Sequence, residues 1–349
     1  MSAPSALAFL RPDLPLRATF PVSQLPTRAK LDQNEAPFAL PEELQQELLR
    51  RAARRSWNRY PQPAEYVEVR ARFAGSLGLD PERVLLTVGG DQAIVAAYLA
   101  AGGPGRKARI FEPTYPIIAH AGAVTHTRLD RVVLGPELAV EERHLDPPTA
   151  LTFLVRPNNP TGGSPPRELV VRALERPGLV FLDEAYADFA GESCLDLVER
   201  APNLLVGRSL SKALLAGVRL GYAVGDPEVI AALERLLFAP YHLNALQLAV
   251  AESFPEIRPH LGAGIAHVQV ERERVAVGLR ALGLTVWPSR GNFLLFAVAD
   301  AADLCQRLAL AGVRVRDVSG LPGLGHHLRV TIGSTEENAL FLEALRAAV

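Results

Sequence analysis

Lysine is scarce in this chain, whose 349 residues include three lysines against 34 arginines. An arginine stays protonated in proteins and cannot attack a carbonyl, whereas a partly buried lysine can lose its proton and do so. Lys30 and Lys107 lie among polar residues, and an arginine-biased composition accounts for them. Lys212 stands instead in the run Ser-Leu-Ser-Lys, which makes it the candidate for covalent amine chemistry.

Cysteines are few, and long apolar runs are absent. Cys194 and Cys305 lie far apart and match no metal or redox spacing, so we expect two free thiols in a reducing compartment. The eight histidines show no metal-ligand spacing, and we expect no metal site. No apolar stretch reaches the roughly 20 residues that cross a bilayer, and the N-terminus lacks the basic start and apolar run of a signal peptide. We therefore expect a cytoplasmic protein.

The chain also lacks an excess of charge of either sign. Its formal net charge is −1, which excludes a global field that would recruit nucleic acid or an anionic membrane. The arginine pairs at 50–51 and 54–55 fall on an expected helix and form a solvated face. With 48% hydrophobic and 21% charged residues, the composition is that of an ordinary soluble globular enzyme.

What is present is an alternation of strands and helices from residue 84 onward. Short, almost wholly apolar strands between helices are typical of a mostly parallel sheet covered on both faces. We expect an α/β fold with a large domain at 41–250, a smaller α/β domain at 251–349 and an N-terminal arm at 1–40 that contributes to the small domain. The expected strands are 84–88, 108–111, 151–155, 179–182, 204–207, 220–224, 292–298, 313–316 and 328–332, and the expected helices include 92–101, 167–174, 227–237, 265–282, 302–311 and 336–348.

Polar residues follow three neighbouring strands of this pattern. Asn158-Asn159-Pro160-Thr161-Gly162 follows the first, Asp183-Glu184-Ala185-Tyr186 the second, and Ser209 to Lys212 the third. Because ligands of open parallel sheets collect at the carboxyl ends of the strands, these three runs are expected to face one crevice.

These runs, in this order, resemble those of the fold-type I pyridoxal-phosphate-dependent aminotransferases of the class II subgroup, and within them the histidinol-phosphate aminotransferases. The resemblance extends from Leu31-Asp32-Gln33-Asn34-Glu35 to Leu328-Arg329-Val330-Thr331-Ile332-Gly333. It implies a pyridoxal 5′-phosphate cofactor and the fold type described above.

The resemblance also implies roles for the site residues. Lys212 would bind the cofactor covalently and then shuttle a proton on the substrate. Asp183 would keep the pyridine nitrogen protonated, although an aspartate after a strand can also serve only as a helix N-cap. Tyr186 and Asn159 would hydrogen-bond the 3-hydroxyl of the ring, and Asn159 can also be a turn residue before a proline.

A further group is implied in holding the cofactor phosphate and ring. Tyr115 would stack on the ring, with a core tyrosine as the alternative, and Tyr60 would reach the phosphate across the interface of a homodimer. The phosphate would be bound by the start of a helix, by two hydroxyls and by a guanidinium, namely by Gly90, Asp91, Gln92, Ser209, Ser211 and Arg219.

For the substrate, the resemblance points to Arg329, with Arg316 and Asn34 nearby. It implies transfer of the amino group of histidinol phosphate to 2-oxoglutarate, giving imidazole-acetol phosphate and glutamate, in histidine biosynthesis. An aromatic or other amino-acid aminotransferase and a threonine-phosphate-type decarboxylase share the same motifs and stay open as alternatives. Two features depart from the family: the segment from Lys212 to Arg219 is one residue short, and no tyrosine precedes Tyr60.

Overall fold

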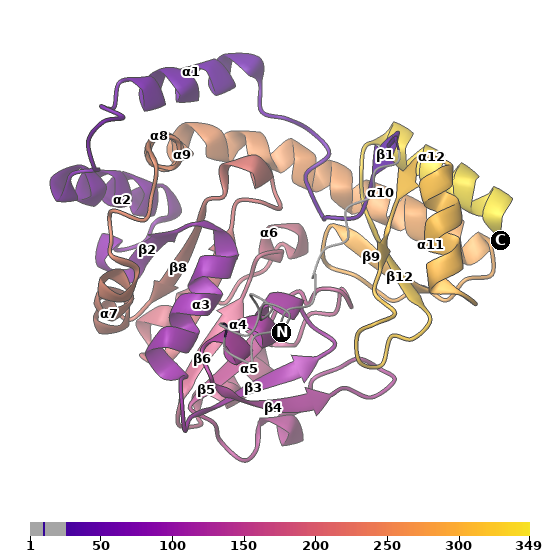
Figure 1. Ribbon diagram of the computed structural model, residues 1–349, viewed down its shortest axis with the longest axis horizontal. Coiled ribbons are helices and arrows are strands. Elements are labelled where there is room, and N and C mark those ends of the chain that lie inside the picture. The colour runs from indigo at the N-terminus through magenta and orange to yellow at the C-terminus, as the bar shows by residue number, and fades with distance from the viewer. Residues whose placement is uncertain (1–9, 11–25) are drawn as a thin grey trace, which may run out of the picture.

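The large domain, on the left of Figure 1, is built on a seven-stranded sheet with helices against both of its faces. The computed structural model describes residues 10 and 26–349. The strand order is β2-β8-β7-β6-β5-β3-β4. Strand β8 is antiparallel to both of its neighbours, and the other pairs are parallel. The strands are β2 (Val84–Thr87), β3 (Lys107–Glu112), β4 (Arg128–Val133), β5 (Leu151–Val155), β6 (Leu179–Asp183), β7 (Leu204–Ser209) and β8 (Gly221–Gly225).

The central strands are apolar at successive positions because each face of the sheet buries a core of its own. Leu85 belongs to one core and Leu86 to the other, and Phe181 alternates in the same way with Leu182. Helices α3 (Gly89–Ala101), α4 (Pro116–Val124) and α7 (Pro227–Leu237) cover the first face. The second face is covered by α1 (Glu42–Ala53), α2 (Pro63–Leu77), α5 (Arg167–Leu174), α8 (Ala245–Glu252) and α9 (Phe254–Ile257).

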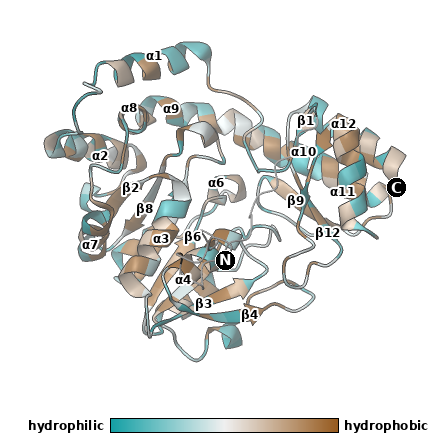
Figure 2. Ribbon diagram, in the orientation of Figure 1, coloured by the Kyte–Doolittle hydropathy of each residue, from teal (hydrophilic) through white to brown (hydrophobic). Residues whose placement is uncertain are grey.

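A second region packs around a core of its own, on the right of Figure 1. The long helix α10 (Leu261–Ala281) runs across to it from the large domain, and the hydropathy colouring shows polar and apolar residues alternating along that helix (Figure 2). Its sheet has the order β11-β12-β9, and a two-stranded pair β1-β10 lies beside it. The remaining elements are β1 (Ala29–Lys30), α6 (Ala187–Ala190), β9 (Phe293–Ala297), α11 (Ala301–Leu310), β10 (Val313–Arg314), β11 (Arg316–Asp317), β12 (His327–Thr331) and α12 (Thr335–Ala348), with short 3-10 helices at Pro81–Arg83, Glu142–Leu145, Leu195–Glu199, Ala216–Val218 and Arg258–His260.

The N-terminal segment joins this second region through β1, which pairs in parallel with β10. The expected arm at 1–40 lies largely outside the described residues, and the domain limits at 40 and 250 stay predictions. Within the described residues, none of the helices has the length and apolar character needed to cross a membrane.

Two expected elements differ from the structure. The helix expected at 92–101 begins earlier, because α3 already starts at Gly89; Gln92 lies in its first turn and its side chain accepts a hydrogen bond from the Val88 N–H at 2.8 Å. The single strand expected at 313–316 is wrong, because β10 pairs with β1 and β11 pairs with β12. Strand β4 was not expected from the sequence, since it lies at the edge of the sheet and carries charged residues.

Candidate active site

The three polar runs meet at one edge of the sheet, as the sequence predicts. The parallel register places Val155 of β5 opposite Asp183 of β6, and Asp183 opposite Gly207 of β7. The loops that follow these strands therefore start side by side, and they carry Asn159 and Lys212 to the same edge.

Asp183 is a buried carboxyl group that forms no ion pair with any cation among the described residues. It is 8% exposed, and its Oδ1 accepts a hydrogen bond from the Ala185 N–H at 2.9 Å. Burial raises its pKa to about 6; the charges of Asp91 and Glu184 act in the same direction, whereas the Ala185 hydrogen bond and the charge of Lys212 oppose them. Glu184 pairs with the Arg208 guanidinium at 3.2 Å, so the two adjacent acids have different surroundings. A cationic ligand beside Asp183 would be stabilised.

Lys212 lies across the crevice with its amine only weakly held. Its Nζ donates to the Gln33 carbonyl oxygen at 3.3 Å and lies 5.9 Å from the centre of the Tyr186 ring. Among the described residues it has no acidic partner, in contrast to Lys30, which pairs with Glu35. The amine is thus available to react.

Tyr186 and Asn34 form a buried pair behind this amine. The Asn34 side chain donates from Nδ2 to the Tyr186 hydroxyl at 3.0 Å and accepts a hydrogen bond from the Thr331 hydroxyl at 3.0 Å. Thr331 also accepts from the Asn34 N–H at 2.9 Å, and the Tyr186 ring meets the edge of Phe293 at 5.1 Å between centres. The hydroxyl of Tyr186 is therefore fixed by residues from both parts of the chain.

Arg329 is a buried guanidinium with neutral partners. It is 7% exposed, and it donates from Nη1 to Asn159 Oδ1 and from Nη2 to the Asp32 carbonyl oxygen, both at 2.6 Å. Its Nε has no hydrogen-bond partner, and it forms no ion pair with any described residue. Burial lowers its pKa to about 10. Because burying a charge without an ion-pair partner is costly, Arg329 is a candidate binding group for an anion.

Arg316 lies directly opposite Arg329 in the β11–β12 pair. It donates from Nε to the same Asp32 carbonyl oxygen, at 3.4 Å, and its charge contributes to the lowered pKa of Arg329. Two guanidinium groups on one sheet face strengthen the attraction for an anion.

The start of α3 and Arg219 form the other end of the crevice. Gly89 has φ +71°, and a Cβ built on it would lie 3.0 Å from Arg219 Nη2, so a side chain there would displace the guanidinium. Arg219 donates from Nη1 to the Ser211 hydroxyl at 3.2 Å and pairs through Nη2 with Asp91 at 3.1 Å. The shortened segment reaches this position with Arg219 itself in the left-handed region, at φ +58°.

Three further groups line the same end. Ser209 Oγ accepts a hydrogen bond from the Ser211 N–H at 3.3 Å, and a Cβ built on Gly90 would lie 3.7 Å from the Ser209 Cβ. The first turn of α3 leaves backbone N–H groups without intrahelical acceptors, and together with Arg219 they make an anion cup. Beside it, the partly buried Tyr115 donates its hydroxyl to Asp91 Oδ1 at 3.0 Å.

The sequence pattern of the family Aminotransferase class I and II matches residues 27–345. The chain belongs to this family. A histidinol-phosphate aminotransferase of Thermobifida fusca is 38% identical over 97% of this chain and 95% of the relative, and one of Chlorobaculum tepidum is 35% identical over 91% and 93%. The crystal structure of a histidinol-phosphate aminotransferase from Sinorhizobium meliloti, in complex with pyridoxal 5′-phosphate, has a TM-score of 0.82 over 93% of this chain and 92% of that one; at 22% identity it shows the shared fold.

The residues at this edge fit pyridoxal 5′-phosphate, the cofactor of this aminotransferase. Asp183 is a buried carboxylate that a cation would stabilise, and a protonated pyridine nitrogen would supply that cation. Arg219, Ser209, Ser211 and the start of α3 offer donors for a phosphate. Lys212 provides a free amine for an aldehyde.

Two of the expected residues are engaged elsewhere or lie apart from this group. The Gln92 side-chain oxygen accepts from the Val88 N–H, which leaves its amide nitrogen and its backbone N–H as the donors it can offer a phosphate. Tyr60 is 76% exposed, and its ring makes a T-shaped contact with that of Tyr241, at 5.7 Å between centres.

Sequence reasoning missed several groups that hold the site together. The Asp32 carbonyl oxygen accepts from Arg329, and the Gln33 carbonyl oxygen accepts from Lys212. The Arg329 guanidinium carbon lies 5.6 Å from the centre of the Phe293 ring. A carbonyl oxygen carries no residue signal, and Phe293 stands in an apolar strand like any core residue. Only the resemblance, which begins at Leu31, could have drawn attention to Asp32 and Gln33.

Proposed function

We propose that this aminotransferase acts on histidinol phosphate, with 2-oxoglutarate as the amino acceptor, in histidine biosynthesis. The observation that carries the proposal is Arg329, a buried guanidinium without an acidic partner among the described residues. An anion of the substrate, the phosphate of histidinol phosphate or a carboxylate of glutamate, would pair with it. The names of the relatives from Thermobifida fusca and Chlorobaculum tepidum support the choice of histidinol phosphate.

In this mechanism Lys212 transfers a proton and Asp183 keeps one in place. When bound, the cofactor supplies an aldehyde that reacts with amines and a ring that takes up the electrons released at the substrate carbon. Lys212 would be the base that takes the proton from the substrate Cα and delivers it to C4′ of the cofactor, because its amine is free of any acidic partner in the described chain. Asp183 holds a proton on the ring nitrogen through its buried carboxylate.

Tyr186, Asn159 and Arg329 would orient the reacting molecules. The Tyr186 hydroxyl accepts a hydrogen bond from Asn34, and the Asn159 side chain accepts one from Arg329. An anion of the substrate that binds Arg329 would therefore also affect the position of Asn159. Tyr186 and Asn159 would both hydrogen-bond the 3-hydroxyl of the cofactor ring, and these bonds would hold that ring beside Tyr115.

The alternatives are an aromatic or other amino-acid aminotransferase and a decarboxylase for a phosphorylated amino acid. Purified enzyme incubated with histidinol phosphate and 2-oxoglutarate should form glutamate and imidazole-acetol phosphate, and phenylalanine should be a poorer donor. Release of carbon dioxide from phosphothreonine, or a preference for phenylalanine, would overturn the proposed substrate.

The Arg329→Lys protein is expected to lose about 30- to 300-fold in kcat/KM for histidinol phosphate, because a lysine cannot replace two parallel guanidinium hydrogen bonds. Steady-state kinetics with both substrates would measure this loss. The exposed Arg346, on the last turn of α12, provides the matched control, and Arg346→Lys should behave as wild type. Equal losses in the two variants would contradict the role of Arg329.

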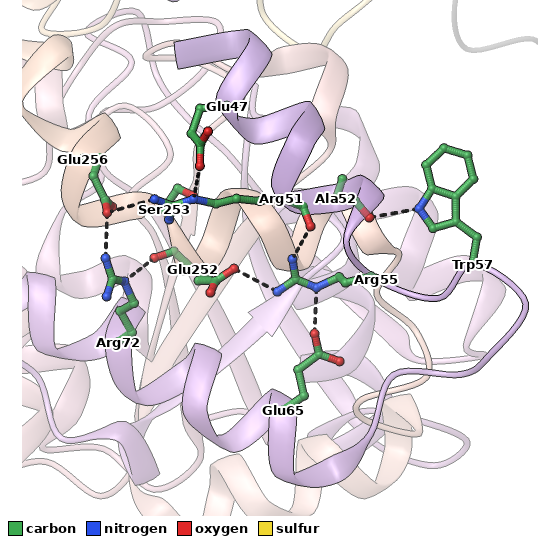
Figure 3. Close-up of polar contacts among 10 residues, drawn as sticks. All are labelled: Glu47, Arg51, Ala52, Arg55, Trp57, Glu65, Arg72, Glu252, Ser253 and Glu256. Carbon is green, nitrogen blue, oxygen red and sulfur yellow. Dashed lines mark hydrogen bonds and ion pairs between the residues drawn. The ribbon is translucent and has the colours of Figure 1, made fainter. Parts of the chain in front are cut away.

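We further propose a homodimer in which Tyr60 completes the cofactor site of the partner. Tyr60, Trp57, Phe238 and Tyr241 are large aromatic side chains exposed on this chain, as expected of a surface that a second subunit covers. Figure 3 shows how the end of α1 that leads to Tyr60 is held: Arg55 pairs with Glu65 at 2.7 Å and with Glu252 at 3.0 Å, and Arg51 pairs with Glu47 and Glu256.

A shared site can be tested by mixing two inactive proteins. Tyr60→Asp would place a carboxylate against the phosphate of the partner's cofactor, while Lys212→Arg removes the reactive amine. Refolded together in equal amounts, they should recover about one quarter of wild-type activity, because half of the dimers are hybrids and each hybrid holds one intact site. No recovery in the hybrids would contradict the shared site.

We also place the enzyme in the cytoplasm, acting on small molecules without a nucleic acid or a membrane as partner. Cys194 is buried and Cys305 partly buried, and both are free thiols. Among the described residues no group of histidine, cysteine and acidic side chains could hold a metal ion.

A further inference from the structure

Asp91 places a carboxylate at the anion cup. It lies in the first turn of α3, and its two oxygens have different partners: Oδ1 accepts the Tyr115 hydroxyl at 3.0 Å, and Oδ2 pairs with Arg219 Nη2 at 3.1 Å. The same guanidinium donates to Ser211 at 3.2 Å. Arg219 therefore already has an anionic partner that belongs to the chain.

This arrangement has two opposing effects on a bound phosphate. A negative side chain is favourable at a helix N-terminus, so Asp91 stabilises α3 and holds Arg219 beside it. A phosphate at the same helix end and the same guanidinium is repelled by that carboxylate. The charge of Asp91 also contributes to the raised pKa of Asp183, which shows that its field extends along the crevice.

We propose that the Asp91 side chain is a positioning residue that orients Arg219 and Tyr115 for the cofactor and, through its charge, weakens the binding of the cofactor phosphate. The inference rests on the proposed function, and it goes beyond the backbone role of this helix start. Before the cofactor binds, Asp91 keeps the guanidinium over Gly89, where a side chain would collide with it. Afterwards Arg219 is shared between Asp91 and the phosphate, while the Tyr115 hydroxyl stays bound to Asp91.

Asp91→Asn removes the charge of the side chain and its bond with Arg219 but keeps the bond with Tyr115, because the amide oxygen still accepts from the Tyr115 hydroxyl while the amide nitrogen faces the guanidinium. We expect its dissociation constant for pyridoxal 5′-phosphate to fall about three- to tenfold, as for one partly exposed charge. The constant for pyridoxal, which has no phosphate, should stay within about twofold of wild type. Spectroscopic titration of the cofactor-free protein with each compound measures both.

Asp226 offers a matched control, since it caps the N-terminus of α7 through the Glu228 N–H, at the opposite end of β8. Asp226→Asn should leave both dissociation constants unchanged. Tyr115→Phe removes the other contact of Asp91 and should change the circular dichroism of the bound cofactor, because the ring loses its fixed neighbour, while thermal unfolding reports whether each variant is folded.

Weaker or unchanged binding of pyridoxal 5′-phosphate by a folded Asp91→Asn protein would overturn the inference. So would an equal gain for pyridoxal, since the effect would then not concern the phosphate. If the wild-type protein bound neither compound, the proposed function would fail instead, and the two failures are thus distinguishable.

Discussion

The Lys212→Arg protein is expected to keep its fold and to lose turnover by about a thousandfold or more. General acid–base catalysis contributes roughly 10²- to 10⁴-fold, and the covalent step adds to it. The arginine keeps the positive charge near the Tyr186 ring and the Gln33 carbonyl oxygen, so the crevice keeps its shape. It cannot give up a proton at neutral pH, so it can neither attack an aldehyde nor move the substrate proton.

Steady-state and single-turnover kinetics would measure this loss, with thermal unfolding as the check on folding. Lys107→Arg is the matched control, because Lys107 is exposed at the start of β3, and it should retain wild-type activity. Turnover within about tenfold of wild type in folded Lys212→Arg would be incompatible with a catalytic amine at this position.

Asp183→Asn is expected to inactivate the enzyme and, at the same time, to stabilise its cofactor-free form. Activity should fall about 10²- to 10³-fold, as when one preorganised electrostatic contact is lost. The stabilisation follows from burial: the pKa of Asp183 is raised from 3.8 to about 6, so at neutral pH the cofactor-free fold carries an unfavourable charge. Its removal should raise the free energy of unfolding by about 2–3 kcal/mol at pH 7.

The sign of the pH dependence distinguishes this account from simple damage to the fold. Between pH 3.8 and about 6 the folded protein holds a proton on Asp183 that the unfolded chain has lost, so this group makes stability fall as pH rises. Asp183→Asn should remove that fall. Asp196, whose pKa the Arg167 guanidinium lowers, has the opposite sign, and stability from it is lost as pH falls. Urea unfolding of cofactor-free wild type, Asp183→Asn and Asp196→Asn at several pH values would measure these slopes; a wild-type slope unchanged by Asp183→Asn would contradict the raised pKa.

The sequence predicted the strands and helices whose hydrophobic pattern is uninterrupted. The limits of β5, α5 and α7 are those expected, because β5 is a short apolar run and the two helices combine an apolar period with a proline at or just before their first residue. Strand β4 was missed because an edge strand needs few apolar residues. The break between β10 and β11 was missed because the two halves pair with strands distant in the sequence, which a local pattern cannot show.

The sequence predicted the site residues that follow the end of a strand, and it missed the contacts between residues that are distant in the sequence. Asn159, Asp183 and Lys212 follow consecutive strands of the sheet, and the parallel register is sufficient to bring them together. The contacts of Arg329 with the Asp32 carbonyl oxygen and of Asp91 with Arg219 join residues 297 and 128 positions apart. No spacing rule covers such pairs, and only the folded chain shows that Arg329 has no acidic partner among the described residues and that Arg219 pairs with Asp91.

Reduction of the cofactor-loaded enzyme with borohydride, followed by peptide mapping, tests the central claim most directly. The chain has three lysines, so the position of a stable pyridoxyl group is decided among few candidates. We predict a pyridoxyl group on Lys212 alone. A pyridoxyl group on Lys30 or Lys107, or none on any peptide, would contradict it.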